Sequence, residues 1–214
     1  MVNYRLKSII VFFVKNFPRQ LARTELVKLV YLFEYNHTQT FCEGFSGTKF
    51  IRHMHGPYAS EIIDAVNELC NEGVLSCQEY PTIYGSTGYL YKIKDDELAL
   101  EYRLDDEQET IGWYIINETR SLGYNDIIEK AYSTPPMVTI VKEEVKWGFK
   151  QIGREINMAK KKPLLKFSEE EIEEAKKRLD LSSRGSDEDY YEHYLEQFRK
   201  LEPFRRRATS CLLK

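Results

Sequence analysis

The sequence lacks any hydrophobic run long enough to cross a membrane. Its longest apolar run, residues 9–14, is six residues long and lies between Lys7 and Lys15. A transmembrane helix needs about 20 predominantly apolar residues, and no small-residue cleavage site of a secretory signal follows this run. We therefore expect a cytoplasmic protein that has no membrane partner.

Cysteine is scarce and follows no pattern. None of the four cysteines forms a C-x-x-C pair, which is the usage that a reducing compartment tolerates. No flanking residues resemble the signature of a catalytic cysteine, and Cys70 falls on the apolar face of a predicted helix, where a cysteine behaves as a small hydrophobic residue. The sequence therefore predicts no thiol nucleophile, and no regular disulfide framework among Cys42, Cys70, Cys77 and Cys211.

The motifs of phosphate, dinucleotide and acyl-transfer chemistry are missing. The chain has no Walker loop, no dinucleotide-binding fingerprint and no G-x-S-x-G. His53 and His55 share one face of an extended segment, but a zinc site needs three or four protein ligands. The other histidines, His37 and His193, come with no C-x-x-C, H-E-x-x-H or clustered carboxylates. We expect no cofactor, no metal site and no catalytic residue, so the protein is predicted not to be an enzyme.

Positive charge is not in excess. The formal net charge is -3, which gives no net attraction toward nucleic acid or acidic membranes. Helices followed by a hairpin also outline a winged-helix DNA-binding regulator, which stays open as an alternative. The helix before the hairpin, however, carries Glu61, Asp64, Glu68 and Glu72 without a lysine or arginine, whereas phosphate contacts require positive charge. Contact with nucleic acid is therefore expected only through the basic tail at residues 205–207.

Apolar residues recur at helical spacing in several segments. Thr24 and Asn125 are the predicted N-caps of two of these helices. Residues 74–94 are rich in β-branched and aromatic side chains around the turn residues Gly85 and Gly88, which predicts an antiparallel hairpin. The predicted helices span residues 4–16, 24–37, 58–72, 105–122, 125–132 and 138–158, the last with Val145, Phe149, Ile152 and Ile156 facing inward.

The segment RHMHGPYASEIIDAV, residues 52–66, joins an extended stretch to a helix. Pro57 disfavours the helical region for Gly56 and suits the first turn of a new helix. An apolar stripe at helical spacing begins at residue 62. The predicted role of the segment is architectural: it forms a corner that starts a core helix and leaves Tyr58 and Glu61 exposed.

Tyrosine is abundant, with 15 residues in the chain. A tyrosine buries a large area and keeps a polar group, so tyrosine-rich surfaces are frequent at protein interfaces. Some of these side chains are expected in the core. The candidates for partner contacts are Tyr58 and Glu61 at the corner, Tyr80, Tyr84, Tyr89 and Tyr91 in the hairpin, and Tyr190, Tyr191 and Tyr194 near the C-terminal end.

The composition changes after residue 158. A basic step at residues 160–163 is followed by a capping box that opens at Ser168 and predicts a charged helix to about Leu181. We therefore expect two parts, a core domain over residues 1–158 and a charged helical extension over residues 159–214.

The order of several short motifs resembles that of a known family. Lys28-Leu-Val-Tyr31-Leu lies in the most apolar predicted helix, and Phe45-Ser-Gly47-x-x-Phe50 and His55-Gly56-Pro57-Tyr58-x-x-Glu61 follow it. A helix that closes with Leu69-x-x-x-Gly73 and the hairpin complete the pattern. Over residues 5–150 this pattern resembles the SocA-like Panacea domain, which supplies the antitoxin of many bacterial and phage toxin-antitoxin pairs.

The resemblance implies a fold, a function and a partner. The fold is mostly α with a small antiparallel sheet (α+β), and Lys28, Tyr31, Gly47, Gly56 and Pro57 are its structural motif residues. The implied function is neutralisation of a cognate protein toxin by direct contact, without enzymatic activity or a cofactor. In one branch of the family the antitoxin instead resembles a proteolytic adaptor, which adds a protease as a partner. Relatives often carry a histidine where this chain has Tyr132-Ser-Thr-Pro135-Pro136, and the extension lies outside the resemblance.

Overall fold

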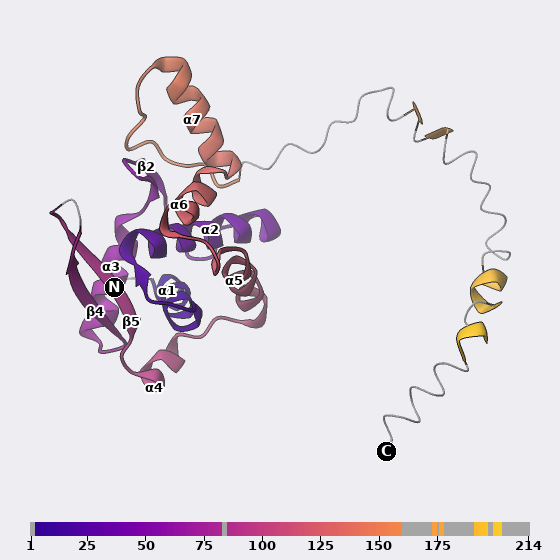
Figure 1. Cartoon of the computed structure of the whole chain (residues 1–214), viewed down its shortest axis with the longest axis horizontal. Coiled ribbons are helices and arrows are strands. Elements are labelled where there is room, and N and C mark those ends of the chain that lie inside the picture. Colours follow the sequence, from indigo (N-terminus) through magenta and orange to yellow (C-terminus); the bar gives the residue numbers. More distant parts are fainter. Residues whose placement is uncertain are drawn as a thin grey trace. The chain divides into compact units, whose positions relative to one another are not determined.

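The computed structural model describes residues 3–82, 85–159, 173–174, 176–177, 191–196 and 199–202. The chain divides into two units, residues 1–162 and 163–214. In the first unit, helices surround the central helix α2 (Arg23–Phe41), and two small antiparallel sheets lie at one side (Figure 1). The first unit is thus mostly α with a small antiparallel sheet, as the sequence predicts.

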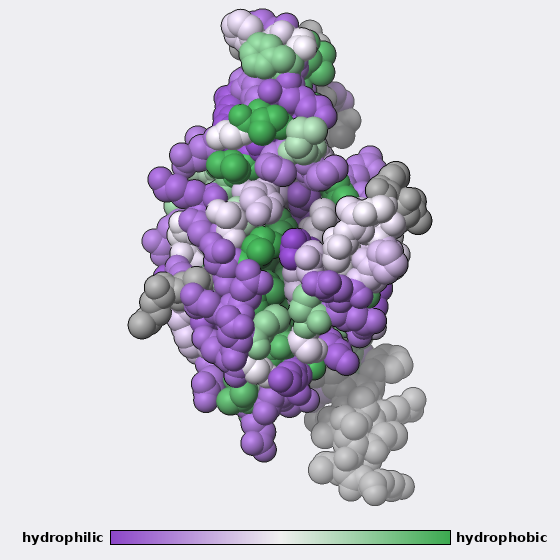
Figure 2. All heavy atoms as spheres, turned by 90° about the vertical axis from the view of Figure 1, so that its left-hand side faces the viewer, coloured by the Kyte–Doolittle hydropathy of each residue, from purple (hydrophilic) through white to green (hydrophobic). Residues whose placement is uncertain are grey.

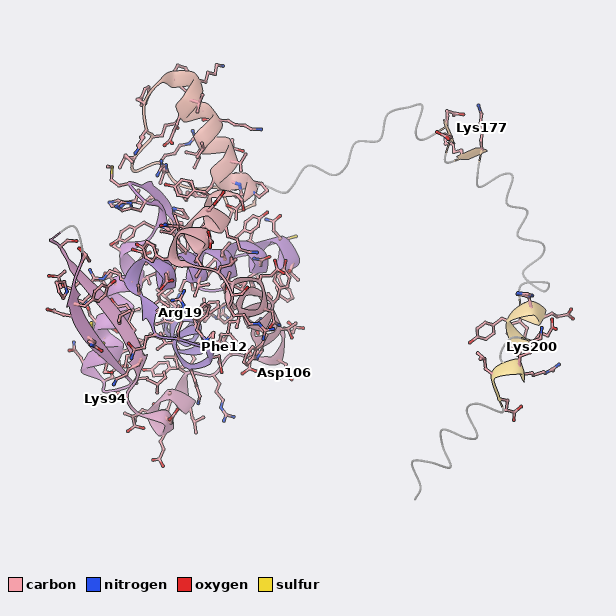
Figure 3. All side chains as sticks on the ribbon, in the orientation of Figure 1. Phe12, Arg19, Lys94, Asp106, Lys177 and Lys200 are labelled. Atoms are coloured by element: carbon pink, nitrogen blue, oxygen red, sulfur yellow. The ribbon has the colours of Figure 1, made fainter. Side chains whose placement is uncertain are left out.

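The helices α1 (Tyr4–Asn16) and α2 form the centre of the hydrophobic core. Every residue from Leu6 to Val14 is buried, and α2 contacts α1, α5, α6 and β3. The predicted bounds of α1 are confirmed, but the cap of α2 differs from the prediction. The N-cap residue of α2 is Ala22 and not Thr24, because the Glu25 carboxylate accepts the Ala22 N–H at 3.0 Å. Glu25 also pairs at 2.6 Å with Arg19, which Figure 3 labels.

A three-stranded antiparallel sheet contains the predicted hairpin. Strands β4 (Leu75–Pro81) and β5 (Thr87–Ile93) pair directly, and β1 (Leu21–Ala22) pairs with the other edge of β5. At the hairpin end Tyr80 pairs with Gly88, where an added Cβ would come within 2.3 Å of the Tyr80 ring. The sequence does not reveal β1, because two residues are too few to show an alternation.

The second sheet is the corner that the sequence predicts around the Gly-Pro step. Strands β2 (Ile51–His53) and β3 (Gly56–Tyr58) pair antiparallel, with Arg52 opposite Pro57. The expectation that Pro57 lies in the first helical turn is therefore wrong. The chain reverses before Gly56, whose φ is +93°, and Pro57 continues as a strand. The helix α3 (Ser60–Asn71) then begins and buries the predicted stripe Ile62, Val66 and Leu69, together with Ala65.

Two short helical turns, α4 (Asp96–Ala99) and η1 (Leu100–Tyr102), lead into α5 (Asp106–Thr119) and α6 (Tyr124–Tyr132). The N-cap of α6 is Gly123 rather than the predicted Asn125, because the Asp126 carboxylate accepts the Gly123 N–H at 3.0 Å. Helix α5 packs closely on α1. A Cβ at Gly112 would come within 2.2 Å of the ring of Phe12, which Figure 3 labels.

The prediction of one helix over residues 138–158 is wrong. Helix α7 spans Pro135–Trp147 and ends at Gly148, whose φ of +74° is the left-handed conformation typical of a helix C-terminus. The chain then returns to β2, where Gly153 N–H donates to Arg52 O at 2.7 Å and Ile156 N–H to Phe50 O at 2.8 Å. Of the four residues expected to face inward, Ile156 is buried and the other three are exposed.

Few residues of the second unit are described. Residues 173–174, 176–177, 191–196 and 199–202 are helical, and Lys200 pairs with Glu196 one turn away at 2.9 Å. Figure 3 labels Lys177 and Lys200. Tyr190 and most of the helix predicted from Ser168 lie outside the described residues, and the boundary predicted at residues 158/159 stays a prediction. Within the described part of the chain, no helix is long and apolar enough to span a membrane.

Candidate functional site

The predicted motif residues of α2 hold the β2–β3 corner from inside the domain. Lys28 is 2% exposed, and its Nζ donates to the Pro57 carbonyl at 2.7 Å. Burial, together with the nearby Arg52 guanidinium, lowers the pKa of Lys28 to about 7. The lysine therefore fixes the Gly-Pro strand to the central helix, at the expense of burying an amine.

Tyr31, one turn further along α2, reaches the start of α7. Thr134 is the N-cap residue of α7, and its hydroxyl donates to the Ala131 carbonyl at 2.8 Å. The Tyr31 hydroxyl therefore donates to Thr134 Oγ1, at 2.7 Å. The Tyr31 ring also meets the Phe50 ring edge to face, with centroids 5.3 Å apart, and burial raises the pKa of Tyr31. Lys28 and Tyr31 thus connect α2 to the corner and to α7.

A buried ion pair that the sequence does not reveal joins the corner to α7. Arg52 in β2 donates from Nε and Nη2 to the two carboxylate oxygens of Glu144, at 2.9 and 3.0 Å. Its Nη1 donates to the Tyr132 hydroxyl at 3.0 Å. The Arg52 hydrogen bonds hold the pKa of Glu144 below its usual value. The sequence contains one indication that Glu144 has a buried partner. Glu144 continues the stripe of Met137 and Ile140 at helical spacing, and a charge on the buried face of a helix requires a partner.

Gly56 is required at the corner for two reasons. Its φ of +93° is a backbone conformation that side chains with a Cβ rarely adopt. An added Cβ would also come within 2.7 Å of the Tyr132 ring, which packs over this residue. The ring of Tyr132 is in turn held by Arg52. Gly56 thus lets the corner approach α6.

Gly47 lies in a second turn that is also held from α2. Glu34, which is 2% exposed, accepts the backbone N–H groups of Phe45 and Ser46 at 2.9 Å each. Gly47 follows with a φ of +72°, and it lines a hollow together with Glu61. Gly47, a predicted structural residue, and Glu61, a predicted partner-contact residue, therefore lie at the same surface.

The residues predicted for partner contacts differ in exposure. Glu61 is exposed, and Tyr58 and Tyr89 are half-buried. The Tyr58 ring lies beside the His53 ring, with centroids 4.9 Å apart, and the Arg23 guanidinium lies 3.7 Å from the centroid of the Tyr89 ring.

One predicted hairpin residue, Tyr91, differs from these three. Tyr91 is 2% exposed and accepts a hydrogen bond from Arg23 Nε at 3.2 Å, so its side chain belongs to the core rather than to the surface. Alternation does not distinguish the two tyrosines, because Tyr89 and Tyr91 share one face of β5. They differ in that Tyr91 pairs with Leu21 of β1, whereas β1 does not reach Tyr89. Tyr84 lies outside the described residues.

The outer side of α3 is acidic. Lys7 pairs with Glu68 at 2.8 Å and with Glu72 at 2.6 Å, and its hydrogen bond lowers the pKa of Glu72. Glu61 and Asp64 add two exposed carboxylates on the same helix. This negative charge disfavours contact with phosphates, which weakens the winged-helix alternative for this helix.

Within the part of the chain that the structure describes, no three His, Cys, Asp or Glu side chains come together as a metal site would require. His53 at the end of β2 and His55 in the β2–β3 turn are both exposed. His53 contacts Tyr58, so the structure places it beside a predicted contact residue.

The fold and the corner together define an α+β helical domain whose Gly-Pro strand is fixed to a central helix by a buried lysine. The family model "Antitoxin SocA-like, Panacea domain" matches residues 26–136, more than half of the 214 residues, and the chain belongs to this family. The matched region includes all five structural motif residues predicted from the sequence. No curated protein and no solved structure matches the chain. The domain is therefore antitoxin-like.

Proposed function

We propose that this protein is a cytoplasmic antitoxin that neutralises a cognate protein toxin by direct protein-protein contact. The match of the antitoxin family model to residues 26–136 carries the proposal. The matched residues include the β2–β3 corner, α3 and the β4–β5 hairpin, so the candidate contact residues of the corner and the hairpin lie within the family domain. The protein acts in this proposal as a binding module and not as an enzyme.

The corner and the hairpin are the proposed contact surface, with Tyr58, Glu61 and Tyr89 as its first residues. Figure 2 views the side of the molecule that carries both sheets. A broken strip of hydrophobic side chains runs down the middle of this face between hydrophilic ones. An apolar centre with a polar border is typical of protein interfaces. This surface therefore suits a protein partner.

The corner is held in place before any partner binds. Lys28 fixes the Pro57 carbonyl, next to Tyr58, and the hydrogen bonds of Arg52 fix β2. A preorganised surface loses less conformational entropy on association, which favours affinity. The buried hydrogen bonds of Lys28 and Arg52, which we call the buried network, thus fix the backbone of the proposed contact surface.

Two finer features belong to the same proposal. The protein is a proteolytic adaptor if it delivers the bound toxin to a protease, which is the role that the resemblance implies for one branch of the family. Residues 159–214 form, in this proposal, a separate extension that adds contacts to the toxin. Both features are separable from neutralisation itself by deletion of the extension or of the protease gene.

The test is co-expression with the neighbouring gene, whose product the proposal expects to be toxic. The proposal expects that the full-length protein restores growth and that the two proteins co-purify in a fixed ratio. Toxin that stays abundant and bound indicates neutralisation by contact, whereas toxin that disappears only in protease-positive cells indicates the adaptor route. Unrescued growth with both proteins expressed would contradict the proposal.

A further inference from the structure

The end of α7 exposes an unusual concentration of large apolar side chains. Val145 is 80% exposed and Trp147 is 62% exposed, and Phe149 and Ile152 follow at 61% and 46%. We refer to these four residues as the α7 tip. In Figure 1 α7 is the uppermost helix, and Figure 2 shows hydrophobic side chains at the corresponding end of the molecule. Exposed apolar groups that gather in this way mark interaction sites more often than scattered ones do.

The α7 tip is held in its exposed conformation by the buried network. Glu144, next to Val145, is paired with Arg52, and the same carboxylate accepts the Gln151 N–H at 2.8 Å. Gly153 N–H donates to the Arg52 carbonyl at 2.7 Å. The opposite face of α7 is buried on the domain through Met137 and Ile140. The apolar side chains are therefore displayed on an anchored support.

The charges around the α7 tip are mainly positive. Lys142, Lys146 and Lys150 are exposed. The carboxylates of the same stretch are engaged, because Glu143 pairs with Arg154 and Glu144 pairs with Arg52. The electrostatic potential at the α7 tip is therefore positive and attracts a negatively charged partner.

The α7 tip also has a concave side. Trp147, Phe149 and Ile152 line an open hollow together with Lys150, Arg154 and Glu143, and the Glu143 carboxylate pairs with Arg154. A hollow accepts a protruding apolar group of a partner, which is how buried anchor residues act at protein interfaces. Anionic lipid headgroups offer the same charge, but a flat bilayer surface does not fill a hollow that lies between a helix end and a returning loop.

We propose that the α7 tip docks an apolar segment of the cognate toxin that is bordered by acidic side chains. This inference rests on the proposed antitoxin function and adds a second contact surface, separate in sequence from the corner and the hairpin. The toxin segment inserts an apolar side chain between Trp147, Phe149 and Ile152, and its carboxylates face Lys146 and Lys150.

The experiment measures the dissociation constant between the full-length protein and the purified product of the neighbouring toxic gene. The tip variant carries Trp147→Ser and Phe149→Ser, and the matched control carries Tyr114→Ser and Tyr124→Ser, which are exposed aromatic residues of α5 and α6. We expect the tip variant to raise the dissociation constant by about 30-fold or more, as the loss of an interface anchor does. The control is expected to stay within about twofold of the wild type.

A charge variant with Lys146→Glu and Lys150→Glu tests the acidic partner. It is expected to weaken binding about tenfold at low salt and less at high salt, because salt screens exposed charges. Since all these side chains are exposed, unchanged thermal unfolding of each variant confirms that it folds.

The outcomes separate this inference from the proposed function. If the wild type binds the toxin and the tip variant binds equally well, the α7 tip inference is overturned and the antitoxin proposal stands. If the wild type does not bind, both are overturned. If the tip variant loses binding only to vesicles of phosphatidylcholine and phosphatidylserine, the surface is a membrane contact and the inference is overturned.

Discussion

Arg52 and Glu144 lie 92 residues apart in the sequence and form a buried, two-pronged ion pair, with Nε to Oε1 at 2.9 Å and Nη2 to Oε2 at 3.0 Å. Arg52 belongs to the corner and Glu144 to α7. One pair of side chains therefore connects the two surfaces that we propose for toxin binding. Its loss is expected to affect both of them.

Removal of one partner of this pair leaves a buried charge without compensation. We predict that Glu144→Ala lowers the free energy of unfolding by about 3–5 kcal/mol. The double variant Arg52→Met, Glu144→Ala is expected to lose less than the sum of the losses of Arg52→Met and Glu144→Ala, because neither charge then remains buried alone. Chemical denaturation of the four proteins gives the coupling energy. Additive effects would contradict an interaction between the two side chains.

Gly56→Ala tests the contact between the corner and α6. Strain at a positive φ destabilises a residue with a Cβ by about 1–2 kcal/mol, and the clash with Tyr132 is expected to add to it. Gly85→Ala is the matched control, because Gly85 has a φ of +75° but nothing within 4 Å of its added Cβ. The difference between the free energies of unfolding that the two variants lose gives the contribution of the Tyr132 contact. Equal losses of the free energy of unfolding would show that the Tyr132 ring moves away from the added Cβ without loss of stability.

Lys28 predicts a pH dependence of stability. The pKa of Lys28 is lowered from 10.5 to about 7 in the folded protein. Between these values the unfolded chain binds a proton that the folded protein does not, so stability rises with pH. The slope from this group is at most about 1.4 kcal/mol per pH unit, and it vanishes below the folded pKa, where both states are protonated.

The measurement compares the free energy of unfolding at pH 7 and pH 9 in the wild type and in Lys28→Met. We expect the rise with pH to be smaller in the variant, because methionine does not titrate and fills similar space. An identical rise in both proteins would show that the Lys28 amine stays protonated when buried.

Strong local patterns explain what the sequence predicts well. The bounds of α1 and the pairing of the hairpin follow from periodicity and turn residues within one segment. The extension of α7 past Gly148 is wrong because Val145, Phe149, Ile152 and Ile156 happen to repeat at helical spacing. The left-handed glycine ends the helix, and the exposed residues form the α7 tip instead.

The candidate site is less accessible from the sequence, because its key contacts join distant segments. The motif residues Lys28 and Gly56 are predicted through the family resemblance, but their partners depend on three-dimensional packing. No local pattern pairs Arg52 with Glu144, or places the Tyr132 ring over Gly56. The buried Tyr91 likewise pairs with Leu21 of β1, a strand of only two residues that no sequence pattern reveals.

The central claim is that the corner surface binds the toxin directly, and titration calorimetry of the purified toxin with corner variants tests it. The corner variant carries Tyr58→Ser and Glu61→Lys. Its control carries Tyr124→Ser and Glu107→Lys, which place the same changes on an exposed tyrosine and on a first-turn carboxylate of another helix. We predict that the corner variant raises the dissociation constant by about 30-fold or more and that the control stays within about twofold. Wild-type affinity in the corner variant would contradict the account.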